Sequence, residues 1–168
     1  MRPPRSKEEQ ILVWCGVVAQ LNRTRTSRIL AGGDLPYPLF ILLRHFCHDP
    51  AREWTVGSLT SAFETEQPGM TKQVQKLLDR GLLIGRPDPA DGRSRLLRVT
   101  QKGVRLRDRL VRRLEPDRDR VFSGWPDADI SEFHRLLGRL RDELESGRED
   151  IALPATALQP RARTEPSD

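Results

Sequence analysis

The sequence predicts a mainly helical protein with one small two-stranded β-ribbon. Apolar residues recur at helical spacing through most of the chain. The exception is residues 82–99, where two short apolar runs flank a turn rich in proline, aspartate and glycine. Residues 70–113 also hold thirteen Lys and Arg against four Asp and Glu, a net charge of +9, whereas the whole chain carries +5. Such local basicity is typical of a surface that binds nucleic acid.

The N-terminal part of the chain predicts two helices. Residues 6–9 form a capping box between Ser6 and Glu9, which places the start of the first helix just before Ile11. This helix is expected to run to about Leu30 and to stop at two glycines. Residues 35–47 are apolar on more than one helical face, which predicts a central second helix. The Asp-Pro pair at 49–50 is expected to close it.

A third and a fourth helix follow, joined by a turn at Gln67. Residues 55–64 predict a short helix, and Pro68 and Gly81 suit the first position and the end of the next one. The fourth helix directs one apolar stripe toward a core: Met70, Val74, Leu77 and Leu78. Its other face then holds side chains that can bind base edges and phosphates: Thr71, Lys72, Gln73, Gln75 and Lys76.

The ribbon and two further helices complete the prediction. Residues 82–84 and 94–99 are expected to pair across the turn at 87–93, whose residues supply fixed or positive φ. Thr100 is expected to cap a helix through Leu114 that Pro116 ends or kinks. The last helix, 127–145, carries an apolar seam: Ile130, Phe133, Leu137, Leu140 and Leu144. That seam predicts either a dimer interface or packing within the chain.

Three segments of the chain carry a resemblance to a known family: residues 77–83, the turn at 86–94 and residues 99–103. Together they resemble the winged helix-turn-helix of the multiple-antibiotic-resistance-regulator (MarR) family. The resemblance implies a dimerisation helix at 1–34, a winged helix-turn-helix domain at 35–100 and dimerisation helices at 101–147. It also implies that Arg93, at the tip of the wing, enters the minor groove of DNA and that Asp91 holds this arginine in position.

The residues and the resemblance together predict a homodimeric transcriptional regulator that binds double-stranded DNA. The resemblance further implies a repressor that a small-molecule effector releases from DNA. A dimer would place two reading helices about 34 Å apart, so its operator would be pseudo-palindromic, with half-sites about 10 bp apart. The residues expected to contact DNA are Gln67, Thr71, Lys72, Gln75, Lys76, Asp91, Arg93, Ser94 and Arg95. No residue is assigned to the effector.

Two other functions stay open. Some MarR-family members sense peroxide through a cysteine on the first helix, where Cys15 lies. Its neighbours Val13, Trp14, Val17 and Val18 predict burial, which raises a thiol pKa and makes the thiol inert. The alternative to redox sensing is therefore a structural thiol. A winged helix can also bind RNA or protein, because a fold does not fix a function.

Enzymatic or metal chemistry finds little support. His45, Cys47, His48 and Asp49 lie close in sequence, but no second ligand group with recognisable spacing follows. We therefore expect neither an enzyme, a metal site nor a cofactor. The sequence shows neither a membrane-spanning run nor a signal-peptide core, which predicts a cytoplasmic location. Residues 148–168 have the composition of a disordered tail.

Overall fold

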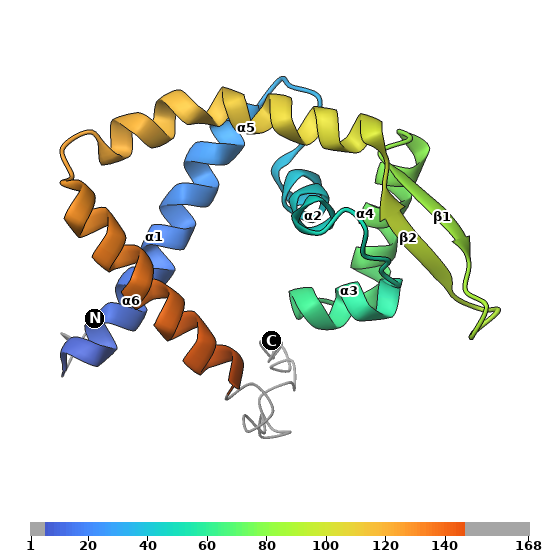
Figure 1. Cartoon of the computed structure of the whole chain (residues 1–168), viewed down its shortest axis with the longest axis horizontal. Helices are drawn as coiled ribbons and strands as arrows, with labels where there is room; N and C mark the ends of the chain where they lie inside the picture. Colours follow the sequence, from blue (N-terminus) through green and yellow to red (C-terminus); the bar gives the residue numbers. More distant parts are fainter. Residues whose placement is uncertain (1–5, 147–168) are drawn as a thin grey trace, which may run out of the picture. The chain divides into compact units, whose positions relative to one another are not determined.

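The structure, a computed structural model, describes residues 6–146 and confirms a mainly helical fold with a small β-wing. The elements run in the order α1 (Lys7–Leu30), α2 (Tyr37–His48), α3 (Val56–Phe63), α4 (Gln67–Asp79), β1 (Leu83–Pro87), β2 (Arg95–Val99), α5 (Gln101–Phe122) and α6 (Asp127–Ser146) (Figure 1). The chain forms two compact units, of which the first ends at Arg120 and the second begins at Val121. The predicted tail at 148–168 lies outside the described residues.

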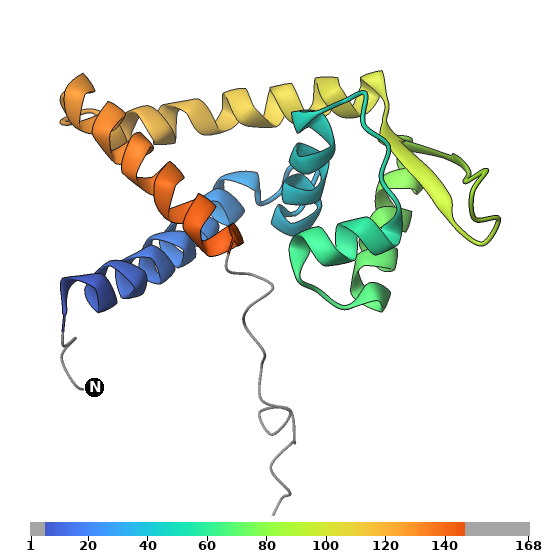
Figure 2. The same cartoon turned by 60° about the horizontal axis from the view of Figure 1, so that its bottom comes forward.

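Helix α2 is the centre of the first unit, as its apolar sequence predicts. Six of its twelve residues are buried: Leu39, Phe40, Leu42, Leu43, Phe46 and Cys47. Because these side chains point in several directions around the helix, α2 can pack against more than one neighbour. Figure 2 shows α2 lying among α3, α4 and the first half of α5. The helix therefore supports α4 and β2 directly.

Helix α4 buries the predicted stripe and ends at the predicted glycine. Met70, Val74 and Leu77 are buried, so the opposite side of the helix faces solvent. Gly81 has a φ of +63°, which a residue without a Cβ adopts at little cost. The Leu82 amide donates to the Leu77 carbonyl at 2.9 Å and closes the helix end. Pro68 is the second helical residue and not the first, because the helix begins at Gln67.

The wing is an antiparallel ribbon of β1 and β2, paired from Leu83↔Val99 to Pro87↔Arg95. Strand β1 begins one residue later than predicted and extends three residues further toward the tip. Trp54, between α2 and α3, forms an isolated bridge to Leu97 on the other edge of β2. The base of the wing therefore has three extended segments, and this third segment was not predicted.

Helix α5 begins where the sequence predicts but does not end there. The Thr100 hydroxyl accepts the Gly103 N–H at 3.1 Å and donates to the Gly81 carbonyl at 2.8 Å, which confirms the N-cap. The predicted end near Leu114 is wrong, and of the two effects expected of Pro116 it does not end the helix, because α5 continues to Phe122. Directly after the proline, Asp117 binds Arg25 of α1 through two hydrogen bonds of 3.0 and 2.5 Å, which anchor the following turn.

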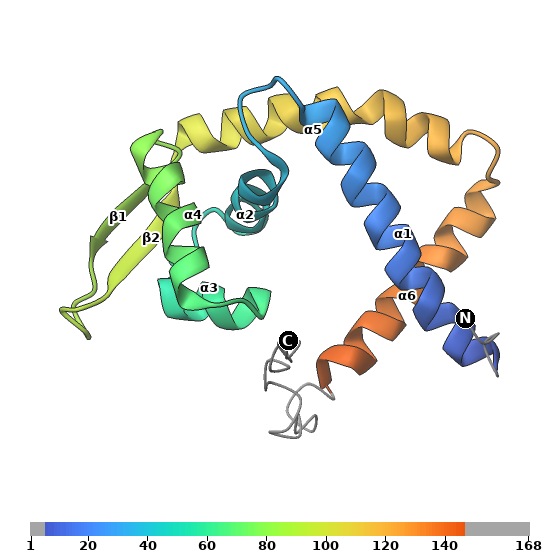
Figure 3. The ribbon, with the colours of Figure 1, turned by 180° about the vertical axis from the view of Figure 1, so that it is seen from behind.

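Two helices leave their apolar side chains uncovered. Only Thr26 and Leu30 of α1 are buried, and α1 extends away from α2, α3 and α4 (Figure 3). Its exposed apolar residues, hereafter the α1 stripe, are Ile11, Leu12, Val13, Trp14, Val17, Val18 and Leu21. Helix α6 has no buried residue, although the ring of its seam residue Phe133 packs against Trp125 with ring centres 5.8 Å apart. None of the described helices is long and apolar enough to cross a membrane.

Candidate nucleic-acid interface

The solvent side of α4 presents all five predicted contact residues of that helix. Their positions lie opposite the buried stripe, and all five are exposed: Gln67, Thr71, Lys72, Gln75 and Lys76. We call this set the α4 reading face. It combines two cations with hydroxyl and amide groups, which suits simultaneous contact with phosphates and base edges.

Hydrogen bonds within α4 distinguish the members of the reading face. The Thr71 hydroxyl donates to the Gln67 carbonyl at 2.9 Å, and the Gln75 amide donates to the Asp79 carboxylate at 2.7 Å. Within residues 6–146, Lys72 and Lys76 form no ion pair that would have to break before they met a phosphate. The two lysines are therefore the available charges of the face, whereas the Gln75 amide is already oriented.

At the tip of the wing, Asp91 shapes the turn that carries Arg93. Its carboxylate accepts the Arg93 backbone N–H at 3.0 Å, and its carbonyl accepts the Ser94 N–H at 2.9 Å. The Asp91 carboxylate thus orders the backbone, and within residues 6–146 it forms no ion pair with the Arg93 guanidinium. The Arg93 side chain is exposed and has no hydrogen bond or ion pair within the described chain.

Arg95 differs from Arg93 although the two lie close in sequence. Its guanidinium donates to the Gly85 carbonyl at 3.0 Å, so the side chain folds back across its own ribbon. Ser94 is half-buried, and its carbonyl accepts the Asp88 N–H at 3.1 Å. Of the predicted wing residues, Arg93 alone is an exposed cation without a partner among the described residues.

The basic region of the sequence does not form one surface. Its C-terminal part lies on α5, where several cations bind other parts of the first unit. Lys102 donates to the Arg80 carbonyl at 2.6 Å, and Arg109 binds the Asp34 carboxylate at 2.7 Å. These side chains connect the end of α4, the α1–α2 loop and α5. A charge count along the sequence cannot tell cations that face solvent from cations that bind other elements, because it ignores which helical face each residue occupies.

Sequence reasoning missed a pair of residues at the base of the wing. Glu53, before α3, accepts two hydrogen bonds from Arg86 of β1, at 2.9 Å from Nε and 2.7 Å from Nη2. The hydrogen bonds and charge of Arg86 hold the pKa of the Glu53 carboxyl below its usual value. No local sequence pattern predicts this contact, because the partners are 33 residues apart in the chain.

The cysteines and histidines do not form a reactive centre in the described chain. Cys47 is buried, and burial raises the pKa of its thiol. Cys15 is only partly buried, which corrects the expected core position, because the apolar residues around it lie on the uncovered α1 stripe. His45 packs between Trp54 and Phe63, with ring centres 4.3 and 5.0 Å away, and burial lowers its pKa. Within residues 6–146 no three potential ligands cluster around a possible metal site.

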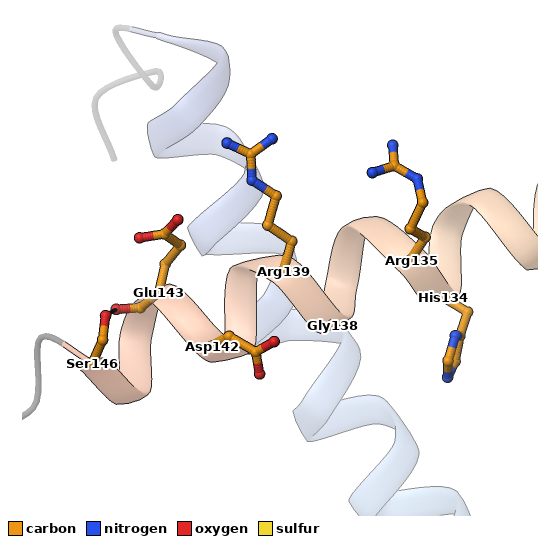
Figure 4. A pocket seen from close by; sticks show the side chains of 7 residues that line it. All are labelled: His134, Arg135, Gly138, Arg139, Asp142, Glu143 and Ser146. Atoms are coloured by element: carbon orange, nitrogen blue, oxygen red, sulfur yellow. Dashed lines mark hydrogen bonds between the residues drawn. The ribbon is translucent and has the colours of Figure 1, made fainter.

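The described hollows do not enclose a ligand site. One lies along α6 and is lined by His134, Arg135, Gly138, Arg139, Asp142, Glu143 and Ser146 (Figure 4). All seven residues belong to one helix, and Figure 4 shows several of their side chains extending into open space. Another hollow is lined only by α1 and its C-terminal end. Neither arrangement defines the effector site that the resemblance implied.

Comparisons with known proteins agree with this geometry. No family model matches the chain. A curated sequence, the HTH-type transcriptional repressor IacR of Pseudomonas putida, is 24% identical over 140 residues, which cover 83% of each chain.

Solved structures of MarR proteins superpose on most of the chain. A MarR protein from Peptoclostridium difficile has a TM-score of 0.73 at 17% identity, covering 90% of this chain and 97% of its own. A MarR family protein from Bacillus stearothermophilus has a TM-score of 0.69 at 22% identity, covering 86% and 99%. Wild-type MarR from E. coli has a TM-score of 0.66 at 16% identity, covering 76% and 93%. The chain therefore has the fold of the solved MarR winged helix-turn-helix proteins.

Proposed function

We propose that this chain is a homodimeric, DNA-binding transcriptional regulator that represses its target genes and is released from DNA by a small ligand. The fold is that of MarR regulators, and the similar Pseudomonas putida sequence is described as a repressor. No group in the described chain supports an enzymatic alternative, and a regulator needs none. The proposed partners are double-stranded DNA, a second copy of the chain and a small-molecule effector.

The observation that carries the DNA proposal is the exposed α4 reading face beside a wing whose Arg93 has no side-chain partner within residues 6–146. Both parts belong to the first unit, and α4 packs directly against β1. The lysines of α4 supply charge for phosphates, and Gln75 supplies an amide for base edges. The wing adds a cation suited to the narrow minor groove. This combination supports binding to duplex DNA more directly than binding to a protein.

Selection from randomised duplexes tests DNA specificity and symmetry together. We expect an enriched inverted repeat whose half-sites are about 10 bp apart. A selection without enrichment would favour the RNA- or protein-binding alternatives. Competition with structured RNA would then identify an RNA partner.

Fluorescence anisotropy with the selected duplex tests Arg93. Arg93→Ala is expected to weaken binding by about 1–3 kcal/mol, because it removes a groove contact. Arg141→Ala is the matched control, since Arg141 is an exposed α6 arginine that binds the neighbouring Asp142. Equal affinity of Arg93→Ala and the unaltered protein would remove Arg93 from the interface.

Dimer formation rests on the uncovered apolar side chains of both units. Trp14 and Val18 of α1 are 58% and 59% exposed, and Leu144 of α6 is 57% exposed. Large apolar areas of this kind are typical of interaction surfaces. A dimer would carry two α4 reading faces, one for each half of an operator. Light scattering of the purified chain measures the expected mass of two copies.

Release by a small ligand can be tested without knowing its site. A ligand that binds the native protein raises its unfolding temperature by mass action. We expect at least one compound from a library of small molecules to raise this temperature and to weaken operator binding. A compound that stabilises the protein but leaves operator affinity unchanged would not be the proposed effector.

Redox sensing is a second candidate because Cys15 is only partly buried. Peroxide would convert an accessible thiol to sulfenic acid within an uncovered apolar surface. Cys15→Ser should then abolish any peroxide effect on DNA binding, whereas Cys47→Ser should not. Operator binding by the unaltered protein that does not change after peroxide would eliminate this candidate.

A further inference from the structure

The wing is held at its base by contacts outside the ribbon itself. Trp54 and Leu97 exchange two backbone hydrogen bonds, with N–O distances of 2.9 and 2.7 Å. Because Gly85 pairs with Leu97 from the other side, β2 lies between β1 and the Trp54 segment. A two-stranded ribbon alone is marginally stable and free to change its twist, whereas an added strand segment restricts it.

An ion pair crosses this three-segment base on its solvent side. Successive residues of a strand point to opposite faces, and Trp54 and Leu97 are buried. Glu53, Arg86 and Leu96 therefore share the outer face. The carboxylate of Glu53 receives both donors of Arg86 at 2.9 and 2.7 Å, so the pair connects the two outer segments across β2. Bidentate pairs of this kind fix orientation as well as distance.

Because this pair lies at the base of the wing, a small change in ribbon twist there produces a larger displacement at the tip. The tip begins two residues beyond Arg86, and its apex lies roughly 12 Å from the pair at the usual rise of a strand. A change in ribbon twist of about 20° would displace that apex by roughly 4 Å. A shift of this size separates a hydrogen-bonded guanidinium from its groove.

We infer that Glu53 and Arg86 are positioning residues that set the angle at which the wing presents Arg93 to DNA. This inference rests on the proposed DNA-binding function. Neither residue needs to touch DNA in this role. The carboxylate acts through its charge and its geometry, so replacing it with an amide of the same shape removes the strong pairing and leaves packing nearly unchanged.

Glu53→Gln gives a test in which two explanations predict opposite signs. Removing a negative charge near bound DNA should tighten binding if Glu53 acts only through long-range electrostatics. Loss of the Glu53–Arg86 ion pair, hereafter the clamp, should instead weaken operator binding by between about twofold and tenfold. Anisotropy titrations at fixed salt measure the difference. Unchanged or tighter binding by Glu53→Gln would overturn the inference.

A double-mutant cycle with Arg93→Ala shows whether the effect passes through the wing tip. In the Arg93→Ala background, Glu53→Gln should no longer weaken binding, because the side chain that the clamp positions is absent. A loss that persists in this background would contradict the inference. The charge-swapped pair, Glu53→Arg with Arg86→Glu, keeps the total charge and should recover most of the lost affinity. A swapped pair as weak as Glu53→Gln would also count against it.

Glu132→Gln is the matched control, because Glu132 receives the same two donors from Arg135 of α6, at 2.8 and 2.7 Å. It should leave operator affinity unchanged, and circular dichroism should show the same helix content for every variant. The experiment distinguishes failure of the proposed DNA-binding function from failure of the positioning role of Glu53 and Arg86. Absence of any duplex binding by the unaltered chain contradicts the proposed function, whereas normal operator binding with an unaffected Glu53→Gln contradicts the clamp alone.

Discussion

Among single residues, different members of the α4 reading face supply positive charge and base recognition. Lys72 is an exposed cation without an ion pair among the described residues, whereas Gln75 is oriented by Asp79. Lys72→Ala should weaken binding to all duplexes similarly and lower the salt-dependence slope by about 1. Gln75→Ala should relax the preference at one base position by about 1–3 kcal/mol. Anisotropy across salt, with single-base operator variants, measures both. A uniform loss for Gln75→Ala would show that its amide reads no base.

Gly103 is a residue whose lack of a side chain the fold requires. A Cβ added there would lie 2.4 Å from the Leu82 carbonyl oxygen and 2.8 Å from a methyl group of Val99. Neither a backbone atom nor a buried neighbour can move freely, so Gly103→Ala should cost about 1–3 kcal/mol of unfolding free energy. Gly57→Ala is the control, because its Cβ would meet only Thr55 Oγ1 at 3.7 Å. Denaturant unfolding that shows equal stability for both variants would contradict this packing.

At the scale of elements, the Arg25–Asp117 pair fastens α1 to α5. Hydrogen bonds from Arg25 and Arg120, together with their charges, hold the pKa of Asp117 below its usual value. A carboxylate whose pKa is lower in the folded than in the unfolded state stabilises the fold above its unfolded pKa of about 4. That stabilisation is lost as the pH falls through the lowered value.

Asp117→Asn should therefore lower the unfolding temperature at pH 7 and have less effect near pH 3. Asp119→Asn is the control, because among the described residues Asp119 binds only the adjacent Arg118, and it is 65% exposed. Thermal unfolding at the two pH values gives the comparison. An equal effect of Asp117→Asn at both would show that its charge is not the source of stability.

At the scale of the whole molecule, the decisive question is what covers the apolar stripes. Leu137 is 45% exposed on the seam of α6. Leu137→Glu should convert a dimer to single chains, because burying an unpaired carboxylate costs several kcal/mol. Light scattering should show half the mass, and operator affinity should fall toward that of a half-site. His134→Glu adds the same charge beside the seam and should leave the dimer intact. A Leu137→Glu protein that stays dimeric would exclude the seam from the interface.

Features that depend on near neighbours could be predicted from the order of the residues alone. The α4 stripe, the Gly81 stop, the Thr100 cap and the turn at the wing tip each follow from contacts within a few residues. Helical periodicity and turn chemistry act at that range, so a single sequence displays them. The α4 reading face was predictable for the same reason, because a buried stripe fixes its opposite side.

Contacts between side chains far apart in the chain could not be predicted and became visible only in the folded protein. Arg25 and Asp117 are 92 residues apart, and Glu53 and Arg86 are 33 residues apart. The continuation of α5 beyond Pro116 and the partly open position of Cys15 likewise depend on what surrounds each residue. The thirteen cations of the basic region are counted alike in sequence, yet packing leaves Lys72, Lys76 and Arg93 available and ties Lys102 and Arg109 to other elements. Charge belongs to a residue, but its availability depends on the partners that the fold brings within hydrogen-bonding distance.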